Sequence, residues 1–173
     1  MNVLLKWAGP FLVLFGIVSC HYMPWFWKSY THPTYGFSLT YPRSWTLKEG
    51  SSFGTTLTLV PPEDDRLFLT NANLVVEANA NKLTLDKLTE KSKIQLSQLL
   101  NQYEVLAQAP TSLGNLKANE IRARYQATEG ERLIRTWIAV SDSFVYVFTF
   151  TCRIQNESNY LKLLPHMIQS FNF

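Results

Sequence analysis

The sequence predicts an α+β domain, in which a central antiparallel β-sheet carries helices on both faces as an α/β/α sandwich. Several short segments alternate apolar and polar residues, which is the period of half-buried strands. A segment in the middle of the chain and another at its end change to helical spacing. Short turns join the strands after the first helix, and strands joined in this way pair antiparallel.

Length and composition indicate one globular domain. The chain has 173 residues, of which 46% are hydrophobic and 14% aromatic, so it can bury a core of its own. The formal net charge of +3 is mild, and no basic run resembles the stripe that nucleic-acid binders usually carry. We therefore predict no nucleic-acid partner.

Residues 1–19 have the features of a secretory signal peptide. Lys6 precedes an apolar run that Pro10 interrupts, and the run is shorter than the roughly 20 residues of a membrane span. The segment ends in Ile17-Val18-Ser19-Cys20, which resembles a bacterial lipobox. This resemblance implies that Cys20 is the mature N-terminus, linked to diacylglycerol and usually N-acylated (a palmitate-type anchor). Two or three acyl chains hold a protein firmly at a membrane, where one does not.

Residues 20–33 are predicted to form the lipidated N-terminus and a tether. Trp25, Phe26 and Trp27 suit the membrane–water interface, where aromatic side chains gather. Two alternatives stay open: an uncleaved anchor from Val3 to Trp27, and packing of the same aromatic residues onto the domain.

Two further residues bear on the anchor and on the compartment. His21 follows the cysteine in place of the aspartate that commonly signals inner-membrane retention, which favours the outer membrane over the inner membrane. Cys152 lies in an apolar run and lacks a partner if Cys20 carries lipid, so we expect a buried, inert thiol.

The domain, residues 34–173, is expected to open with three strands. Residues 36–42 place Phe37, Leu39 and Tyr41 on one face, and Trp45 resumes that face after Pro42. Residues 55–60 repeat the pattern. In residues 72–79 the alternation predicts an inward and an outward set: Ala72, Leu74, Val76 and Ala78 facing in, and Asn73, Glu77 and Asn79 facing out.

Thr84 is a plausible N-cap for an amphipathic helix of about four to five turns. Its apolar positions are Leu85, Leu88, Leu96, Leu99 and Tyr103. Strands are then expected over residues 103–113, 117–127 and 133–140. Residues 143–152 are apolar at nearly every position, which is typical of a strand covered on both faces near the centre of a sheet. The tail predicts a helix, in which Pro165 marks a kink or the first turn of a shorter helix.

These segments together resemble the PsbP-like superfamily, which includes PsbP and the DcrB-type bacterial envelope proteins. The resemblance rests on Gly36-Phe37-Ser38 with Tyr41-Pro42 and Trp45, on "NLVVEA" before the long helix, on "VYVFTFT", and on the final "SFNF". It covers residues 34–173 and implies a sheet with helices on both faces. It also implies a non-enzymatic role in binding or assembly on membrane complexes, and DcrB is the closer likeness.

The residues indicate no catalytic or metal site. Gly50 to Gly54 matches G-x-S-x-G with Ser52 as its serine, but the helix that a nucleophile elbow requires is replaced by a predicted strand. The three histidines, His21, His32 and His166, are too scattered for a zinc motif. Glu63 to Asp65 lacks the spacing of a calcium loop. We therefore predict no enzyme, metal or cofactor.

One basic surface is a candidate contact for an acidic partner or anionic lipid: Arg122, Arg124 and Arg135, with Trp137 close by. The alternative is a solvated sheet face that Glu120 and Glu131 balance, or that a helix covers. The sequence thus predicts a lipid-anchored bacterial envelope protein that binds an unidentified envelope protein or assembles a complex. The alternative is a carrier of a small ligand or metal, with its pocket between sheet and helix.

Overall fold

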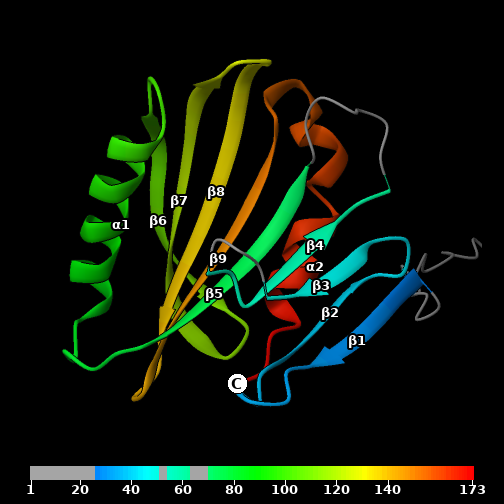
Figure 1. Ribbon diagram of the computed structural model, residues 1–173, viewed down its shortest axis with the longest axis vertical. Coiled ribbons are helices and arrows are strands. Elements are labelled where there is room, and N and C mark those ends of the chain that lie inside the picture. Colours follow the sequence, from blue (N-terminus) through cyan, green and yellow to red (C-terminus); the bar gives the residue numbers. More distant parts are fainter. Residues whose placement is uncertain (1–25, 51–53, 63–69) are drawn as a thin grey trace, which may run out of the picture.

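The computed structural model describes residues 26–50, 54–62 and 70–173 (Figure 1). These residues form strands, one 3₁₀-helix and two α-helices, in the order β1 (Trp27–Thr31), β2 (Ser38–Pro42), β3 (Thr46–Glu49), β4 (Leu57–Val60), β5 (Asn71–Ala78), α1 (Leu85–Leu99), β6 (Glu104–Leu113), β7 (Leu116–Ala127), β8 (Gly130–Val140), β9 (Phe144–Arg153), η2 (Ile154–Tyr160) and α2 (Leu163–Gln169). No helix among them is long and apolar enough to cross a membrane.

The strands form two antiparallel sheets. The large sheet has seven strands in the order β3-β4-β5-β9-β8-β7-β6, and β1 pairs with β2 in a separate hairpin. Each neighbouring pair in the large sheet is antiparallel. The α+β class with an antiparallel sheet is therefore confirmed, and so is the central position of the apolar strand β9.

Alternate residues of β9 belong to two different cores. Tyr146, Phe148 and Phe150 pack into the larger core, which contains most of the buried aromatic side chains. Val145 and Val147 point to the opposite face and pack in the smaller core. Nearly every position of the strand is therefore apolar, because its side chains contribute to a core on each face of the sheet.

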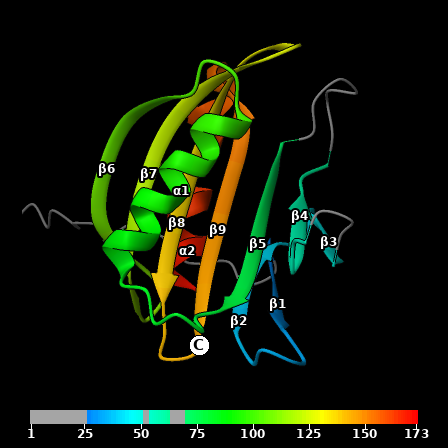
Figure 2. The ribbon, with the colours of Figure 1, turned by 60° about the vertical axis from the view of Figure 1, so that its left-hand side comes forward.

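The two faces of the sheet carry different layers (Figure 2). Helix α1 lies over β7 and β8 on one face. On the other face, α2, η2 and the β1–β2 hairpin pack together over the larger core. Leu164, Met167 and Phe171 from the C-terminal segment are buried there.

Several local details differ from the sequence-based expectation. Residues 27–31, expected in the tether, form β1 and pair with β2. In their sequence, WKSYT, Trp27 and Tyr30 pack against the core. These two residues are three positions apart, so the segment lacks the apolar alternation that predicts a strand. Asn79 is buried and Ala78 is exposed, the reverse of the expectation, because β5 ends at Ala78 and the alternation stops there. Pro165 lies in the first turn of α2, where the missing N–H costs nothing.

Candidate binding groove

A small polar network fixes the position of α1 on the sheet. Thr84 caps the helix, with its side chain accepting a hydrogen bond from the backbone N–H of Lys87. Thr89 is fully buried and accepts a hydrogen bond of 3.0 Å from the amide of Asn119 on β7. The hydroxyl of Thr89 in turn donates to the carbonyl of Leu85. These bonds hold one side of α1 against β7.

The connection from β5 to α1 is held just as firmly. The side chain of Asn79 accepts a hydrogen bond from the backbone N–H of Leu83 at 2.9 Å and donates to its carbonyl at 3.1 Å. The backbone N–H of Asn79 donates to the carbonyl of Ser143. The start of α1 is therefore tied to both β5 and the β8–β9 turn.

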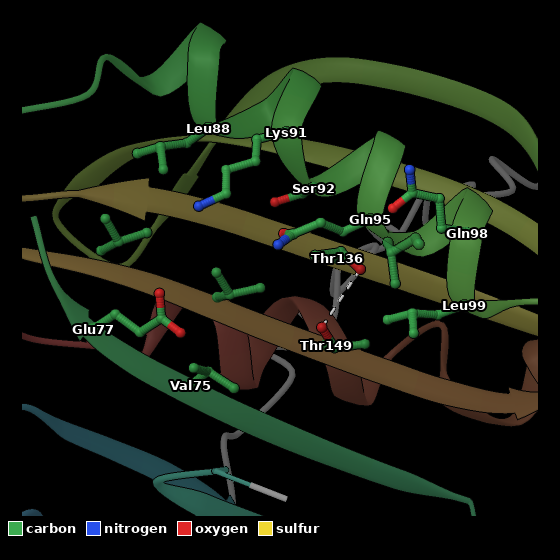
Figure 3. Close-up of a pocket in the computed structure, with 13 residues that line it drawn as sticks. Val75, Glu77, Leu88, Lys91, Ser92, Gln95, Gln98, Leu99, Thr136 and Thr149 are labelled. Atoms are coloured by element: carbon green, nitrogen blue, oxygen red, sulfur yellow. Dashed lines mark hydrogen bonds between the residues drawn. The ribbon is translucent and has the colours of Figure 1, made fainter. Parts of the chain in front are cut away.

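Among the described residues, no helix lies above the strip of sheet that β5 and β9 form beside α1 (Figure 2). A groove of about 470 Å³ runs between this strip and the flank of α1. Figure 3 shows the side chains that line it: Val75, Glu77, Leu88, Lys91, Ser92, Gln95, Leu96, Gln98, Leu99, Thr136, Val145, Val147 and Thr149. Its volume falls in the range of known ligand sites.

The floor of the groove is largely apolar. Val75, Val145 and Val147 line it from β5 and β9. The hydroxyls of Thr136 and Thr149 lie 3.5 Å apart at the base and hydrogen-bond each other, as the dashed line in Figure 3 marks. The floor therefore presents mainly aliphatic surface, and its two threonine hydroxyls are already hydrogen-bonded to each other.

The rim of the groove carries one cation and one anion on opposite sides. Lys91 projects from α1 and Glu77 from β5, near the same end of the groove (Figure 3). Both residues are exposed, and neither forms a salt bridge within the part of the chain that the structure describes. At the other end lies Leu99, with 79% of its surface exposed. The groove thus combines an apolar floor with an opposed pair of charges.

The basic surface predicted from the sequence is a set of ion pairs. Arg122 binds Glu157 of η2 through two hydrogen bonds of 3.0 and 2.6 Å, and this contact is the main cause that raises the pKa of Arg122. Arg124 pairs with Glu104 and Glu131. The positive charges therefore meet acidic side chains of the same chain.

Arg135 and Trp137, the other two residues of the predicted basic surface, are more buried than Arg122 and Arg124. Arg135 pairs with Glu120 at 2.6 Å and lies 5.0 Å from the ring centroid of Trp137. Trp137 is only 3% exposed and belongs to the larger core. The structure thus brings Arg122, Arg124 and Arg135 onto one face. A role of that face toward lipid or an acidic partner stays a prediction.

The predicted membrane-interface residues have different surroundings. Trp25 lies outside the described residues, as does the predicted lipidation site Cys20. Phe26 is 63% exposed, whereas Trp27 packs against the core, with its ring centroid 3.9 Å from that of His166. Trp27 therefore follows the alternative in which these aromatic residues pack onto the domain.

Two histidines that the sequence leaves unassigned have structural contacts. His32 is buried, and its Nδ1 accepts hydrogen bonds from the backbone N–H groups of Thr34 and Tyr35. His166 lies within 3.2 Å of the Thr40 hydroxyl, and burial lowers its pKa. His166 thus joins α2 to the β1–β2 hairpin.

The described residues offer little for covalent or metal chemistry. Cys152 is a free, buried thiol whose pKa burial raises to about 12, as expected for an inert cysteine. Ser52 lies outside the described residues, but the segment after Gly54 is the strand β4 and not a helix. No group of three or more His, Cys, Asp or Glu side chains suited to a metal occurs within residues 26–50, 54–62 and 70–173.

A match to a known protein family shows what this chain is related to. The DcrB family matches residues 55–170, about two thirds of the chain. The chain belongs to the DcrB family. As a member of this family it shares the PsbP-like fold, in agreement with the resemblance drawn from its strands. No curated protein sequence matches the chain.

Solved structures show the same fold at low sequence identity. The cyanobacterial PsbP protein CyanoP from Synechocystis sp. PCC 6803 has a TM-score of 0.65 at 12% identity, covering 84% of this chain and 91% of that one. LpqN of Mycobacterium tuberculosis, described as involved in cell envelope biogenesis, has a TM-score of 0.66 at 14% identity, covering 84% and 89%. The Ran-binding protein Mog1p of Saccharomyces cerevisiae has a TM-score of 0.56 at 10% identity, covering 84% and 94%.

The groove residues were not identified from the sequence, although it carries a partial signal for them. The alternation in β5 places Val75 and Glu77 opposite the larger core, and β9 is apolar on both faces. Neither pattern shows that β5 and β9 are neighbours, because residues 79–143 separate them in the chain. Only the pairing of these strands creates the uncovered strip.

Proposed function

We propose that this DcrB-family chain is a lipid-anchored protein of the bacterial cell envelope that acts by binding a protein partner or by assembling an envelope complex. In this proposal its sheet carries helices on both faces, and it has no catalytic activity. The observation that carries the proposal is the groove beside α1, which leaves an apolar strip of sheet accessible. The described residues that line it include no histidine or cysteine, and Glu77 is the one carboxylate among them.

The surroundings of the groove suit binding better than catalysis. Acid–base catalysis generally requires titratable groups with matched pKa values around one reacting centre. Here the groups with strongly raised pKa values, the buried Cys152 and the partly buried Tyr30, lie outside the groove lining. A rigid apolar floor with polar groups at its rim is typical of a recognition site.

Anchoring through Cys20 would hold this site at a membrane, with the outer membrane favoured over the inner. The test is an intact mass of the protein purified from its own membranes, beside the Cys20→Ala variant. We expect a chain that starts at Cys20 and carries diacylglycerol with further acyl mass, and a variant that lacks this mass. A chain that retains residues 1–19 without lipid would overturn the lipoprotein proposal.

Binding is tested by crosslinking in intact envelopes. We expect one specific protein neighbour, recovered at reduced yield from a variant with Val147→Asp in the groove. A parallel variant with Arg122→Gln and Arg124→Gln tests the paired basic face, which would meet an acidic partner or anionic lipid only if its ion pairs open. Recovery of abundant envelope proteins alone, unchanged in both variants, would count against a binding role.

The second candidate function is a small-ligand carrier at the membrane surface. It is favoured by one observation, because the groove lies between sheet and helix, where such a pocket was expected. A thermal-shift screen with metabolites and metal ions tests it. Stabilisation that Val147→Asp abolishes would support a carrier, and an unchanged melting temperature throughout the screen would remove that function.

A further inference from the structure

We propose that the groove binds one amphipathic α-helix of a protein partner, which lies alongside α1 over β5 and β9. This inference rests on the proposed binding function and specifies which secondary-structure element of the partner the groove binds. It follows from the width of the uncovered strip, from the hydrogen bonding of its strands and from the two charges at its rim.

The uncovered strip has the width of a helix. Neighbouring strands lie about 4.8 Å apart, and an α-helix with its side chains is about 10–12 Å across, so one helix covers about two strands. Helix α1 covers β7 and β8, and the next two strands in the sheet are β9 and β5. A second helix beside α1 would therefore complete this layer (Figure 2).

The length of the groove suits about three helical turns. The lining residues of α1 run from Leu88 to Leu99, which at 1.5 Å per residue is about 16 Å. Leu99 is 79% exposed at one end although it adjoins the apolar floor. A helix with apolar residues at i, i+3, i+4 and i+7 would bury Leu99 together with Val75 and Val147.

The strands beneath the groove favour a helix over an extended peptide. β9 pairs with β5 and β8, and β5 pairs with β9 from Asn71 to Ala78 and with β4 at Ala72–Leu74. The backbone N–H and C=O groups of both strands point sideways within the sheet and not out of the face that the groove lies on. An extended peptide laid on this face would find no backbone partners for its own N–H and C=O groups. A helix satisfies those groups internally and presents only side chains to the strip.

The rim charges specify the flanks of the incoming helix. Lys91 stands on the α1 side and Glu77 on the β5 side, near one end of the groove (Figure 3). A complementary helix carries an acidic residue on the flank toward α1 and a basic residue on the flank toward β5. Such an arrangement fixes the orientation of the helix more than it adds affinity.

The experiment places the photocrosslinker benzoylphenylalanine at Gln95 in the full-length protein in intact cells. Controls carry it at Ser97, which is exposed on α1 away from the groove, and at Ser29, which is exposed on β1. Mass spectrometry of the digested adducts maps the crosslinked segment. We expect the Gln95 probe, and not the Ser97 probe, to label one amphipathic helical segment of another protein.

Charge reversal then tests the proposed orientation. Lys91→Glu and Glu77→Lys are each expected to lower the Gln95 adduct yield by about tenfold, because an attraction becomes a repulsion. Lys93→Glu is the matched control, since Lys93 pairs with Glu90 away from the groove lining. It should leave the yield unchanged. Equal losses from all three variants would contradict the proposal.

The possible adducts separate this inference from the proposed function. Labelling of residues 1–25 of the same chain, of a second copy, of lipid or of a non-helical segment would overturn the helix-binding groove. A specific partner captured from Ser29 and not from Gln95 would also overturn it, while leaving the binding function intact. Capture of no specific partner from any of the three positions would contradict both.

Discussion

At the scale of a single residue, burial determines the reactivity of the Cys152 thiol. Its side chain is fully buried in the larger core, and burial raises its pKa to about 12. Because the thiolate is the reactive form, the folded protein should keep this thiol unreactive at pH 8. In a Cys20→Ser variant, we expect no reaction with Ellman's reagent under native conditions and one thiol per chain in guanidinium chloride. Rapid native labelling would contradict this prediction.

Gly114 is a second residue whose surroundings determine how much a substitution destabilises the protein. It has a φ of +55°, and a Cβ atom placed there would lie 1.8 Å from the carbonyl oxygen of Phe171. Gly114→Ala should therefore lower the free energy of unfolding by more than about 3 kcal/mol, combining backbone strain with a forced shift of the C-terminal segment. Urea denaturation measures the loss.

Gly36 provides the matched control for this substitution. Its φ is +71°, but a Cβ atom there would meet nothing within 4 Å. Gly36→Ala should cost only the conformational strain of about 1–2 kcal/mol. Equal losses for the two variants would show that the contact with Phe171 is unimportant for stability.

At the scale of elements, the seating of α1 depends on one buried polar contact. Thr89→Val keeps the shape of the side chain but removes the acceptor for the amide of Asn119, which then retains only the 3.4 Å contact with Asp86. We expect a loss of about 1–2 kcal/mol in the free energy of unfolding. Ser97→Ala, on the exposed side of α1, should change it by less than about 0.5 kcal/mol.

The same pair of variants connects stability with the groove. Because α1 forms one wall of the groove, a loosened helix should expose the sheet beneath it to hydrogen exchange. We expect faster exchange at Ile121 and Ile138 in Thr89→Val than in Ser97→Ala. Unchanged exchange at both positions would mean that the contact of Thr89 with Asn119 does not hold the helix in place.

At the scale of the whole molecule, His166 couples the N-terminal hairpin to the C-terminal helix. Its ring contacts Trp27 and lies within 3.2 Å of the Thr40 hydroxyl, and burial lowers its pKa below the ordinary 6.5. The unfolded chain therefore binds a proton more readily than the folded one. The contribution of His166 is fully present above about pH 6.5 and is lost as the pH falls below it.

This linkage predicts an acid-sensitive hairpin. We expect the free energy of unfolding to fall between pH 7.5 and 5.5, and the His166→Gln variant to show a smaller fall over the same range. Urea titrations at the two pH values, with Trp fluorescence as the probe, measure both. An equal pH dependence in the two proteins would assign the acid sensitivity to other groups.

The prediction of elements from sequence worked where one local pattern decides the structure. Thr84 begins α1 as its cap, and residues 143–152 match the central strand β9 closely. It failed where packing with distant residues decides. β1 has no alternation of its own, and the positive charge of Arg122 is neutralised by Glu157, which lies 35 positions further along the chain.

By itself the sequence determined the α+β class, the cap of α1, the core side of α1 at Leu85, Leu88 and Leu96, the apolar strand β9 and the DcrB-like order of segments. These follow from local periodicity and from hydrogen-bonding propensities that neighbouring residues share. Leu99, which the sequence predicted on the same side of the helix, is exposed instead. The tertiary structure alone decided that β5 lies beside β9 and that α1 covers β7 and β8 instead. Strand order arises from pairing between segments far apart in the chain, so the uncovered strip, its groove and its opposed charges exist only once the sheet has assembled.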